Sequence, residues 1–209
     1  MHARRLRILL VGASGTLGRA IATELAARHE VIGAGRTSGE VRLDLTDVSS
    51  IRRALEQAGE LDAVVGVAGR VTFAPLADFQ AAPMGESLHT LGITDKLFGQ
   101  VNLALAARDH LRDDGSITLT SGILAEQPIR QGTSASLVNG AIEAFVRAAA
   151  IELPRGLRIN VVSPSVLREA MADYAPYFRG FEAVPAARAA LAFSRSVEGA
   201  ESGKAYRVF

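Results

Sequence analysis

Short apolar runs alternate along this chain with longer segments in which apolar residues recur every three or four positions. The runs have the length and composition of buried strands, and the longer segments have the period of amphipathic helices. The pattern predicts seven strands, at residues 6–11, 30–35, 41–47, 61–67, 116–120, 158–162 and 204–208. It predicts helices at 17–27, 138–153 and 186–196. A further helix carries Ile51, Leu55 and Ala58 and is capped by Thr46 or Asp47. Another begins near Thr94 and is stopped by residues 113–115.

The strand at 61–67 is apolar at nearly every position, which suits a strand covered by helices on both faces. Strands and helices alternate throughout, and 209 residues is the size of one α/β domain. We therefore expect an α/β fold, a single doubly wound domain over 1–209. The segment 70–91 departs from the pattern, because Pro75, Pro83 and Gly85 interrupt any long helix, and irregular structure is expected there.

Three glycines, Gly12, Gly15 and Gly18, join the first strand to the first helix. Strand, glycine turn and helix in this order form the Rossmann dinucleotide-binding arrangement. Gly12 can take the tight turn, Gly15 lets a pyrophosphate approach the backbone, and Gly18 lets the helix pack close to the strand. Free N–H groups at the helix start then face the phosphates. The competing interpretation is a glycine turn that serves packing alone.

The second strand is followed by Arg36, Thr37 and Ser38. In dinucleotide-binding folds this position faces the adenosine ribose, and an acidic side chain there bonds the 2′-hydroxyl but repels a 2′-phosphate. A guanidinium can instead donate paired hydrogen bonds to phosphate oxygens. The sequence therefore favours NADP over NAD. The alternative is a solvated arginine in a loop.

Composition excludes several other kinds of chemistry. The 23 basic and 22 acidic residues nearly cancel, so no nucleic-acid surface is indicated. The absence of cysteine excludes disulfides and thiolate nucleophiles. No metal site is predicted, because the four histidines lack the spacing of ligands: His2, His29, His89 and His110. The apolar run after the basic N-terminus is too short for a signal segment or a membrane span, and we expect a cytoplasmic protein.

The chain resembles the short-chain dehydrogenase/reductase family over nearly its whole length, on residues 11–18, 44–47, 67–69, 115–121, 138–153 and 158–164. The resemblance implies a seven-stranded parallel sheet in the order 3-2-1-4-5-6-7, with helices on both faces. The glycine spacing, GxxGxxG, is that of extended and atypical members, whereas shorter members usually show GxxxGxG. The resemblance also implies residues at the adenine (Asp44, Leu45), near the adenosine ribose (Ala68, Gly69) and beside the nicotinamide (Pro164, Ser165, Val166).

Combining the glycine turn, the second strand end and the resemblance gives one set of predicted cofactor residues. They are Gly12, Ser14, Gly15, Thr16, Leu17, Gly18, Arg36, Thr37, Asp44, Leu45, Ala68, Gly69, Lys96, Pro164, Ser165 and Val166. Lys96 is included because its ammonium can reach the nicotinamide ribose hydroxyls from the facing helix.

The family's catalytic residues are matched only in part. The family's usual set is a serine after the fifth strand, a tyrosine and a lysine four residues apart on the next helix, and an asparagine on the preceding long helix. Ser121 matches the serine, but Ala135 and Asn139 stand where the tyrosine and the lysine belong. Lys96 stands where the asparagine is expected, so lysine and asparagine have exchanged places. By position, no tyrosine of the chain replaces the missing one: Tyr174, Tyr177 and Tyr206.

This exchange suggests a rearranged active site. An ammonium on the facing helix can reach the same nicotinamide ribose hydroxyls, so we expect Lys96, Asn139 and Ser121 to share the site. Partial burial would lower the pKa of Lys96, which could then donate the proton that tyrosine normally supplies. The expected function is NADP-dependent reduction of a small carbonyl compound, or oxidation of the alcohol, with hydride delivered at C4 of the nicotinamide and Ser121 bonding the carbonyl oxygen.

Two alternatives stay open: a catalytically inactive NADP-binding sensor or scaffold, with Lys96 on a solvated face, and a non-redox isomerase or dehydratase on the same fold. The aromatic segment 169–181, with Tyr174, Tyr177 and Phe178, either covers the open end of the site or packs in the core. The resemblance implies a homodimer or homotetramer. Small residues that would let helices of two subunits approach are Ala135, Gly140, Ala141 and Ala144.

Overall fold

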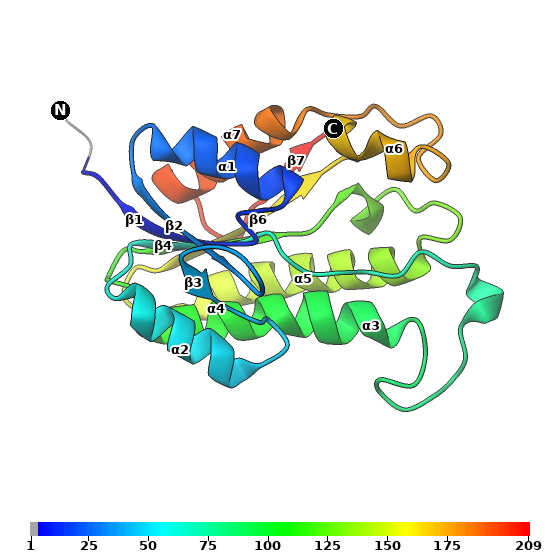
Figure 1. Ribbon diagram of the computed structural model, residues 1–209, viewed down its shortest axis with the longest axis horizontal. Helices are drawn as coiled ribbons and strands as arrows, with labels where there is room; N and C mark the ends of the chain where they lie inside the picture. Colours follow the sequence, from blue (N-terminus) through cyan, green and yellow to red (C-terminus); the bar gives the residue numbers. More distant parts are fainter. Residues whose placement is uncertain (1–3) are drawn as a thin grey trace.

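A computed structural model of the protein describes residues 4–209 and shows one parallel sheet between two layers of helices (Figure 1). Of the residues singled out above, only His2 lies outside this range. The strands are β1 (Arg7–Val11), β2 (Glu30–Gly35), β3 (Val41–Arg42), β4 (Ala63–Gly66), β5 (Ser116–Thr120), β6 (Arg158–Pro164) and β7 (Ala205–Val208). Their order, β3-β2-β1-β4-β5-β6-β7, and their parallel pairing confirm the predicted fold class.

The two faces of the sheet carry different helices. One face is covered by α1 (Thr16–Ala26) and α7 (Ala186–Glu198), and the other by α2 (Val48–Ala58), α4 (Phe98–His110) and α5 (Thr133–Glu152) (Figure 1). Side chains of β1 alternate between the two cores: Ile8 and Leu10 pack with α1 and α7, whereas Leu9 and Val11 pack on the opposite side. Because both faces are covered, the strand reads as a continuous apolar run rather than an alternating one.

The third strand is shorter than predicted. Only Val41 and Arg42 pair with β2, because the Asp44 carboxylate accepts a hydrogen bond of 2.9 Å from the Thr46 N–H and folds the chain into a turn. Of the two residues predicted to cap α2, Asp47 is the N-cap. Its carboxylate accepts a hydrogen bond of 2.8 Å from the Ser49 N–H.

Two helices begin earlier than their apolar patterns indicate. The helix predicted from near Thr94 starts at α3 (Thr90–Gly92) and continues through a π-helical segment, Ile93–Leu97, into α4. Helix α5 starts at Thr133 instead of residue 138, and its first turn buries the small residues Ser134 and Ala135. Small and polar residues carry no apolar period, so sequence reasoning missed both first turns although tertiary packing covers them.

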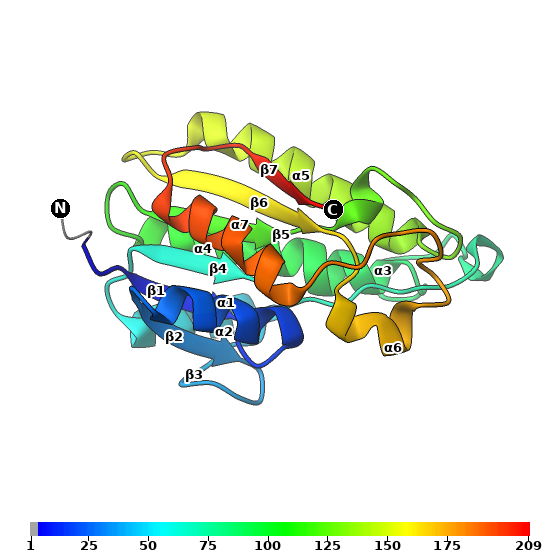
Figure 2. The same cartoon turned by 90° about the horizontal axis from the view of Figure 1, so that it is seen from above.

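Irregular chain gathers at the carboxyl ends of the strands. Seen from above, α6 (Met171–Tyr174) and the segment 70–90 lie beyond this end of the sheet, while the described chain enters at the other end (Figure 2). Within 70–89 the structure contains only a short 3₁₀ turn, Leu76–Asp78, which confirms the irregular segment. Further 3₁₀ turns at Ile123–Ala125 and Arg168–Ala170 border the same edge. No helix within residues 4–209 is long and apolar enough to cross a membrane.

Candidate functional site

The glycine turn after β1 has the geometry that requires glycine at two positions. Gly12 has a φ of +93°, which L side chains rarely adopt, and a Cβ there would lie 3.0 Å from the Ala68 nitrogen. A Cβ on Gly18 would lie 2.1 Å from the Gly12 oxygen, so α1 can approach β1 this closely only with glycine. Gly15 directly precedes the first residue of α1. The turn therefore presents backbone N–H groups at a helix start, where an anion is stabilised.

A cavity of about 290 Å³ opens beside this turn, at the carboxyl ends of β1, β2 and β4. Its lining includes nine of the predicted cofactor residues: Gly12, Ser14, Gly15, Arg36, Thr37, Asp44, Leu45, Ala68 and Gly69. Three others, Thr16, Leu17 and Gly18, lie in the first turn of α1 and line neither this cavity nor the neighbouring one described below. The side chain of Leu17 packs against the core between α1 and the sheet instead.

Some charged side chains of this first cavity have partners within residues 4–209, and one does not. Arg36 is exposed and has no hydrogen bond or ion pair with any other residue of 4–209. Hydrogen bonds from the Thr46 N–H and hydroxyl hold the pKa of Asp44 below its usual range, and the charges of Arg36 and Arg70 act in the same direction. Arg70 is itself bound to Asp95, with 2.8 Å between Nε and Oδ2. Arg36 is therefore a guanidinium available to a ligand.

A second cavity of about 260 Å³ shares Gly69 with the first and continues toward β5 and β6. Sequence reasoning placed Lys96, Ser121 and Asn139 in one site, and all three line this cavity. The three residues predicted beside the nicotinamide line it as well: Pro164, Ser165 and Val166. The two cavities together form a path from Arg36 to Lys96 along the carboxyl edge of the sheet.

Lys96 lines the second cavity next to Gly69, the residue that borders both cavities. Its Nζ donates one hydrogen bond of 2.8 Å to Asn139 Oδ1 and one of 3.1 Å to the Ser121 carbonyl oxygen. Burial lowers the pKa of Lys96 to about 8, because removing the ammonium from water disfavours its charged form. An ammonium carries three N–H donors, and only these two are used within residues 4–209. The third is available to a bound molecule.

The backbone around Lys96 is unusual in two ways. Lys96 lies within the π-helical segment, and such segments occur often at functional sites. Gly69 has a φ of +127°, and a Cβ there would lie 2.7 Å from Lys96 Cγ and 2.8 Å from Lys96 Cα. Lys96 and Lys204 are the only lysines among the 23 basic residues of the sequence.

Sequence reasoning missed two polar residues that support the site. Gln100 is fully buried; its Nε2 donates to the Thr120 carbonyl at 2.9 Å, and its Oε1 accepts from the Thr120 N–H at 2.7 Å. This pair fixes the end of β5 just before Ser121. Glu143 is buried on α5, one turn after Asn139, and its Oε1 accepts a hydrogen bond of 2.8 Å from Ser121 Oγ. Neither residue belongs to a motif, so only tertiary contacts disclose them.

Aromatic side chains form one wall of the second cavity. Phe73, Tyr174 and Phe178 line it, and the Phe73 ring lies 5.5 Å from the Tyr174 ring and 6.4 Å from the Phe178 ring. Both interpretations of segment 169–181 hold in part, because Phe178 is 6% exposed in a small core whereas Tyr174 is 36% exposed. Tyr174 thus reaches this cavity from α6, while Tyr206 bonds Glu201 in another part of the molecule.

One residue of the expected subunit interface is misplaced. Ala135 is 1% exposed and lines the second cavity, so it is part of the site rather than of an outer helix face. Gly140 lies on a more open part of α5, where an added Cβ would meet nothing within 4 Å. The sequence could not separate these faces, because the start of α5 was itself assigned too late.

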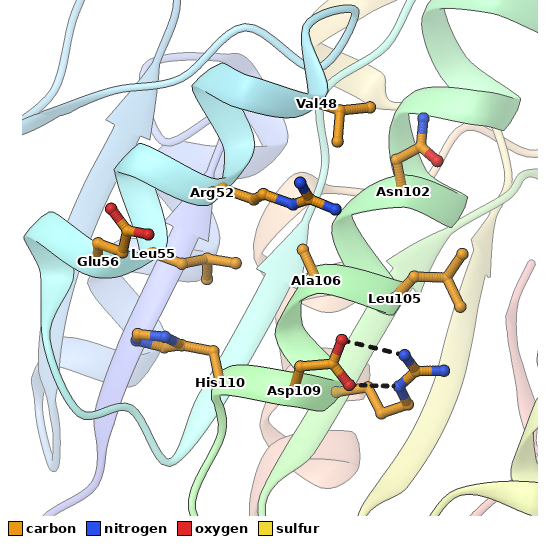
Figure 3. Close-up of a pocket in the computed structure, with 10 residues that line it drawn as sticks. Val48, Arg52, Leu55, Glu56, Asn102, Leu105, Ala106, Asp109 and His110 are labelled. Atoms are coloured by element: carbon orange, nitrogen blue, oxygen red, sulfur yellow. Dashed lines mark hydrogen bonds and ion pairs between the residues drawn. The ribbon is translucent and has the colours of Figure 1, made fainter.

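Another cavity, of about 450 Å³, lies elsewhere, between α2 and α4 (Figure 3). Only helical residues line it, and Figure 3 shows Arg52 between the two helices. Arg108 donates hydrogen bonds of 2.7 and 3.0 Å to the Asp109 carboxylate. It contains no strand end and none of the predicted site residues, whereas ligands of open α/β sheets bind at the carboxyl ends of strands. Across residues 4–209 no group of three acidic or histidine side chains is placed to hold a metal ion.

Comparison with known proteins agrees with this geometry. A family model described as Enoyl-(Acyl carrier protein) reductase matches residues 2–208. The chain belongs to the short-chain dehydrogenase/reductase family. Among curated relatives, a ketoacyl reductase assigned to the granaticin polyketide synthase of Streptomyces violaceoruber is 28% identical over 191 residues, covering 81% of this chain and 76% of that protein. Hydroxynaphthalene reductase of Aspergillus fumigatus is 27% identical over 187 residues, covering 78% and 67%.

Two solved structures extend the comparison. The protein lin1944 from Listeria innocua is 50% identical, with a TM-score of 0.93, over 98% of this chain and 100% of that one. A small-chain dehydrogenase crystallised in complex with NADPH is 23% identical, with a TM-score of 0.84, over 98% and 97%. The second likeness shows a shared fold. The family model and the two curated relatives are all named as reductases.

Proposed function

We propose that this short-chain dehydrogenase/reductase is an NADP-dependent oxidoreductase that interconverts a carbonyl group and an alcohol in an apolar small molecule. The observation that carries the proposal is the position of Lys96. Lys96 lines the second cavity, and its ammonium is fixed by Asn139 and the Ser121 carbonyl; among residues 4–209 one of its N–H donors has no partner and is left for a bound molecule. With a pKa of about 8, Lys96 can give up a proton near neutral pH.

The residues of the first cavity fit NADP. The glycine turn leaves space for a pyrophosphate at the start of α1, and Arg36 lies at the end of β2 without a side-chain partner among residues 4–209. No acidic side chain follows β2 at the position where one would repel a 2′-phosphate. When bound, NADPH would supply the hydride. Lys96 would hold the proton that the carbonyl oxygen receives, and the aromatic wall would exclude water from the reacting groups.

The second cavity favours an apolar substrate. Among the described residues that line it, Lys96 is the only charged one, and most of the others are aliphatic or aromatic. Flat rings pack favourably against Phe73 and Tyr174 in edge or offset arrangements. The names of two relatives, a ketoacyl reductase and a hydroxynaphthalene reductase, agree with ketones or phenols of this kind.

Cofactor binding is the first test. Purified protein is titrated with NADPH and with NADH, following the fluorescence of the reduced nicotinamide. We expect NADPH to bind more tightly, and Arg36→Ala to weaken NADPH by about ten- to a hundredfold without changing NADH, since charge-assisted hydrogen bonds contribute about 1.5–3 kcal/mol. Arg42→Ala, an exposed arginine outside the cavity, is the control. Binding of neither cofactor would reject the proposal.

Turnover is the second test. The protein is incubated with NADPH and a panel of neutral ketones that includes cyclohexanone and 1-tetralone, and oxidation of the cofactor is followed at 340 nm. Lys96→Met should remove turnover, whereas Lys204→Met, at the other lysine, should not. The absence of a tyrosine on α5 favours a second candidate, a catalytically inactive NADP-binding protein. Tight NADPH binding without turnover of any ketone would select it.

Assembly and location are parts of the same proposal. The outer faces of α4 and α5 expose apolar side chains, among them Phe98 at 49%, Leu105 at 42% and Leu137 at 50%. Burying such surface between subunits would form the homodimer or homotetramer that the family resemblance implies. Light scattering after size exclusion measures the state directly, and a monomer at all concentrations would reject this part. A cytoplasmic location remains an expectation.

A further inference from the structure

A chain of polar contacts runs from the site to the last strand, and the proposed reaction leaves it unused. Ser121 Oγ donates to Glu143 Oε1 at 2.8 Å, and Glu143 Oε2 lies 3.1 Å from an Arg207 guanidinium nitrogen on β7. Arg207 also pairs with Glu126. Ser121 and Glu143 are each 4% exposed. A carboxylate this buried is costly unless its partners hold it in place, and here a hydroxyl and a guanidinium do so.

The direction of the first hydrogen bond is fixed by chemistry. An ionised carboxylate can only accept, and a serine hydroxyl has a single proton. While Glu143 is ionised beside Arg207, the Ser121 proton points at Glu143 and is withheld from the cavity. The Ser121 oxygen then faces a bound molecule with its lone pairs alone. This differs from the sequence-based expectation that Ser121 would bond a carbonyl oxygen, which needs a donor.

We propose that Glu143 is a positioning residue that makes Ser121 a hydrogen-bond acceptor, so that the site recognises the alcohol form of its substrate. This inference rests on the proposed function and deepens it. An alcohol can accept a hydrogen bond from Lys96 and donate one to Ser121, whereas a ketone can only accept. Lys96 bonds Asn139 and Ser121 bonds Glu143, and these two partners lie one helical turn apart on α5.

A thiol reporter tests the arrangement without any turnover. The chain has no cysteine, so Ser121→Cys introduces the protein's single thiol. A neighbouring carboxylate disfavours the thiolate, and only the thiolate reacts rapidly with iodoacetamide. Adding Glu143→Gln should therefore raise the alkylation rate at pH 7.5 at least threefold. Adding Glu152→Gln, an exposed glutamate at the end of α5, should leave it unchanged. An unchanged rate in the Glu143→Gln variant would overturn the proposal.

A double-mutant cycle separates positioning from folding. With NADP and 1-tetralol, Glu143→Gln should lower kcat at least tenfold and change the affinity for NADPH less than twofold. In a Ser121→Ala background, Glu143→Gln should cause no further loss, because a residue that acts only through Ser121 has no effect once the hydroxyl is gone. Equal losses in both backgrounds would show that Glu143 acts through the fold, and would overturn the proposal.

Alcohol recognition gives the third readout. The wild-type protein should show a lower KM for 1-tetralol than for 1-tetralone, and Glu143→Gln should narrow this difference, since a glutamine can donate to Ser121 Oγ and release its proton toward the cavity. A lower KM for the ketone would overturn the proposal. If the wild-type protein turns over neither compound, the proposed function fails, and the role of Glu143 is then decided by the thiol reporter alone.

Discussion

Replacing Lys96 by methionine should remove a specific pH dependence of stability. Burial lowers the pKa of Lys96 from 10.5 to about 8, and that difference corresponds to about 3 kcal/mol of preference for the neutral amine. The folded protein thus releases this proton near pH 8, whereas the unfolded chain keeps it until about pH 10.5. Between these values the unfolded state binds more protons, so stability rises with pH. From pH 7.0 to 9.5 this gain amounts to about 2 kcal/mol.

Urea unfolding, followed by circular dichroism at pH 7.0 and 9.5, measures the effect. Other groups titrate equally in both proteins, so the difference between wild type and Lys96→Met isolates this lysine. Lys204→Met, at an exposed lysine, should behave as the wild type. At pH 7.0, Lys96→Met should be more stable than wild type by about 1–2 kcal/mol, because loss of two hydrogen bonds offsets part of the relief from burying a charge.

The pKa can also be read directly. A protein labelled with ¹³C at the lysine ε-carbons gives two lysine signals, because the chain has two lysines, and Lys204→Met assigns them. The Lys96 signal should titrate with a midpoint near pH 8. Carbonyl reduction should fall as the pH rises through the same value, since the ammonium is the proton donor. A midpoint at or above pH 10, or identical pH dependence of stability with and without Lys96, would refute the reasoning.

Three further substitutions test the frame around the site. Gly69→Ala should displace Lys96 and abolish turnover, because the new Cβ would lie 2.7 Å from Lys96 Cγ. A shift of the Lys96 NMR signal would report this displacement, and an unmoved signal would contradict the prediction. Gln100→Ala leaves the buried Thr120 N–H unpaired and should lower the free energy of unfolding by about 1–3 kcal/mol in urea, unlike the control Gln127→Ala on an exposed turn. Phe193→Ala opens a cavity in the fully buried core between α7 and the sheet, and it should lower the free energy of unfolding by about 3–5 kcal/mol in the same urea assay. NADPH affinity should be retained at temperatures where the protein stays folded.

Local features of the sequence determined most of the fold. The continuous apolar runs, such as the one that became β4, gave the strands, and their alternation with helical periods gave a parallel sheet covered on both faces. Gly12 and Gly18 could be read as a nucleotide turn because their roles depend on backbone sterics within a few residues. The same holds for Arg36, whose position follows from the end of β2. Each of these signals is contained in one short segment.

Only the tertiary structure decided how the catalytic end is built. The hydrogen bonds from Lys96 to Asn139 and from Ser121 to Glu143 join residues 43 and 22 positions apart, and no local pattern encodes such pairs. The early starts of α3 and α5 were hidden for the same reason, since their small polar residues are buried by distant parts of the chain. Periodicity records which face of a segment is apolar. Which polar groups meet at the carboxyl edge depends on how whole elements pack, and that is a property of the folded molecule.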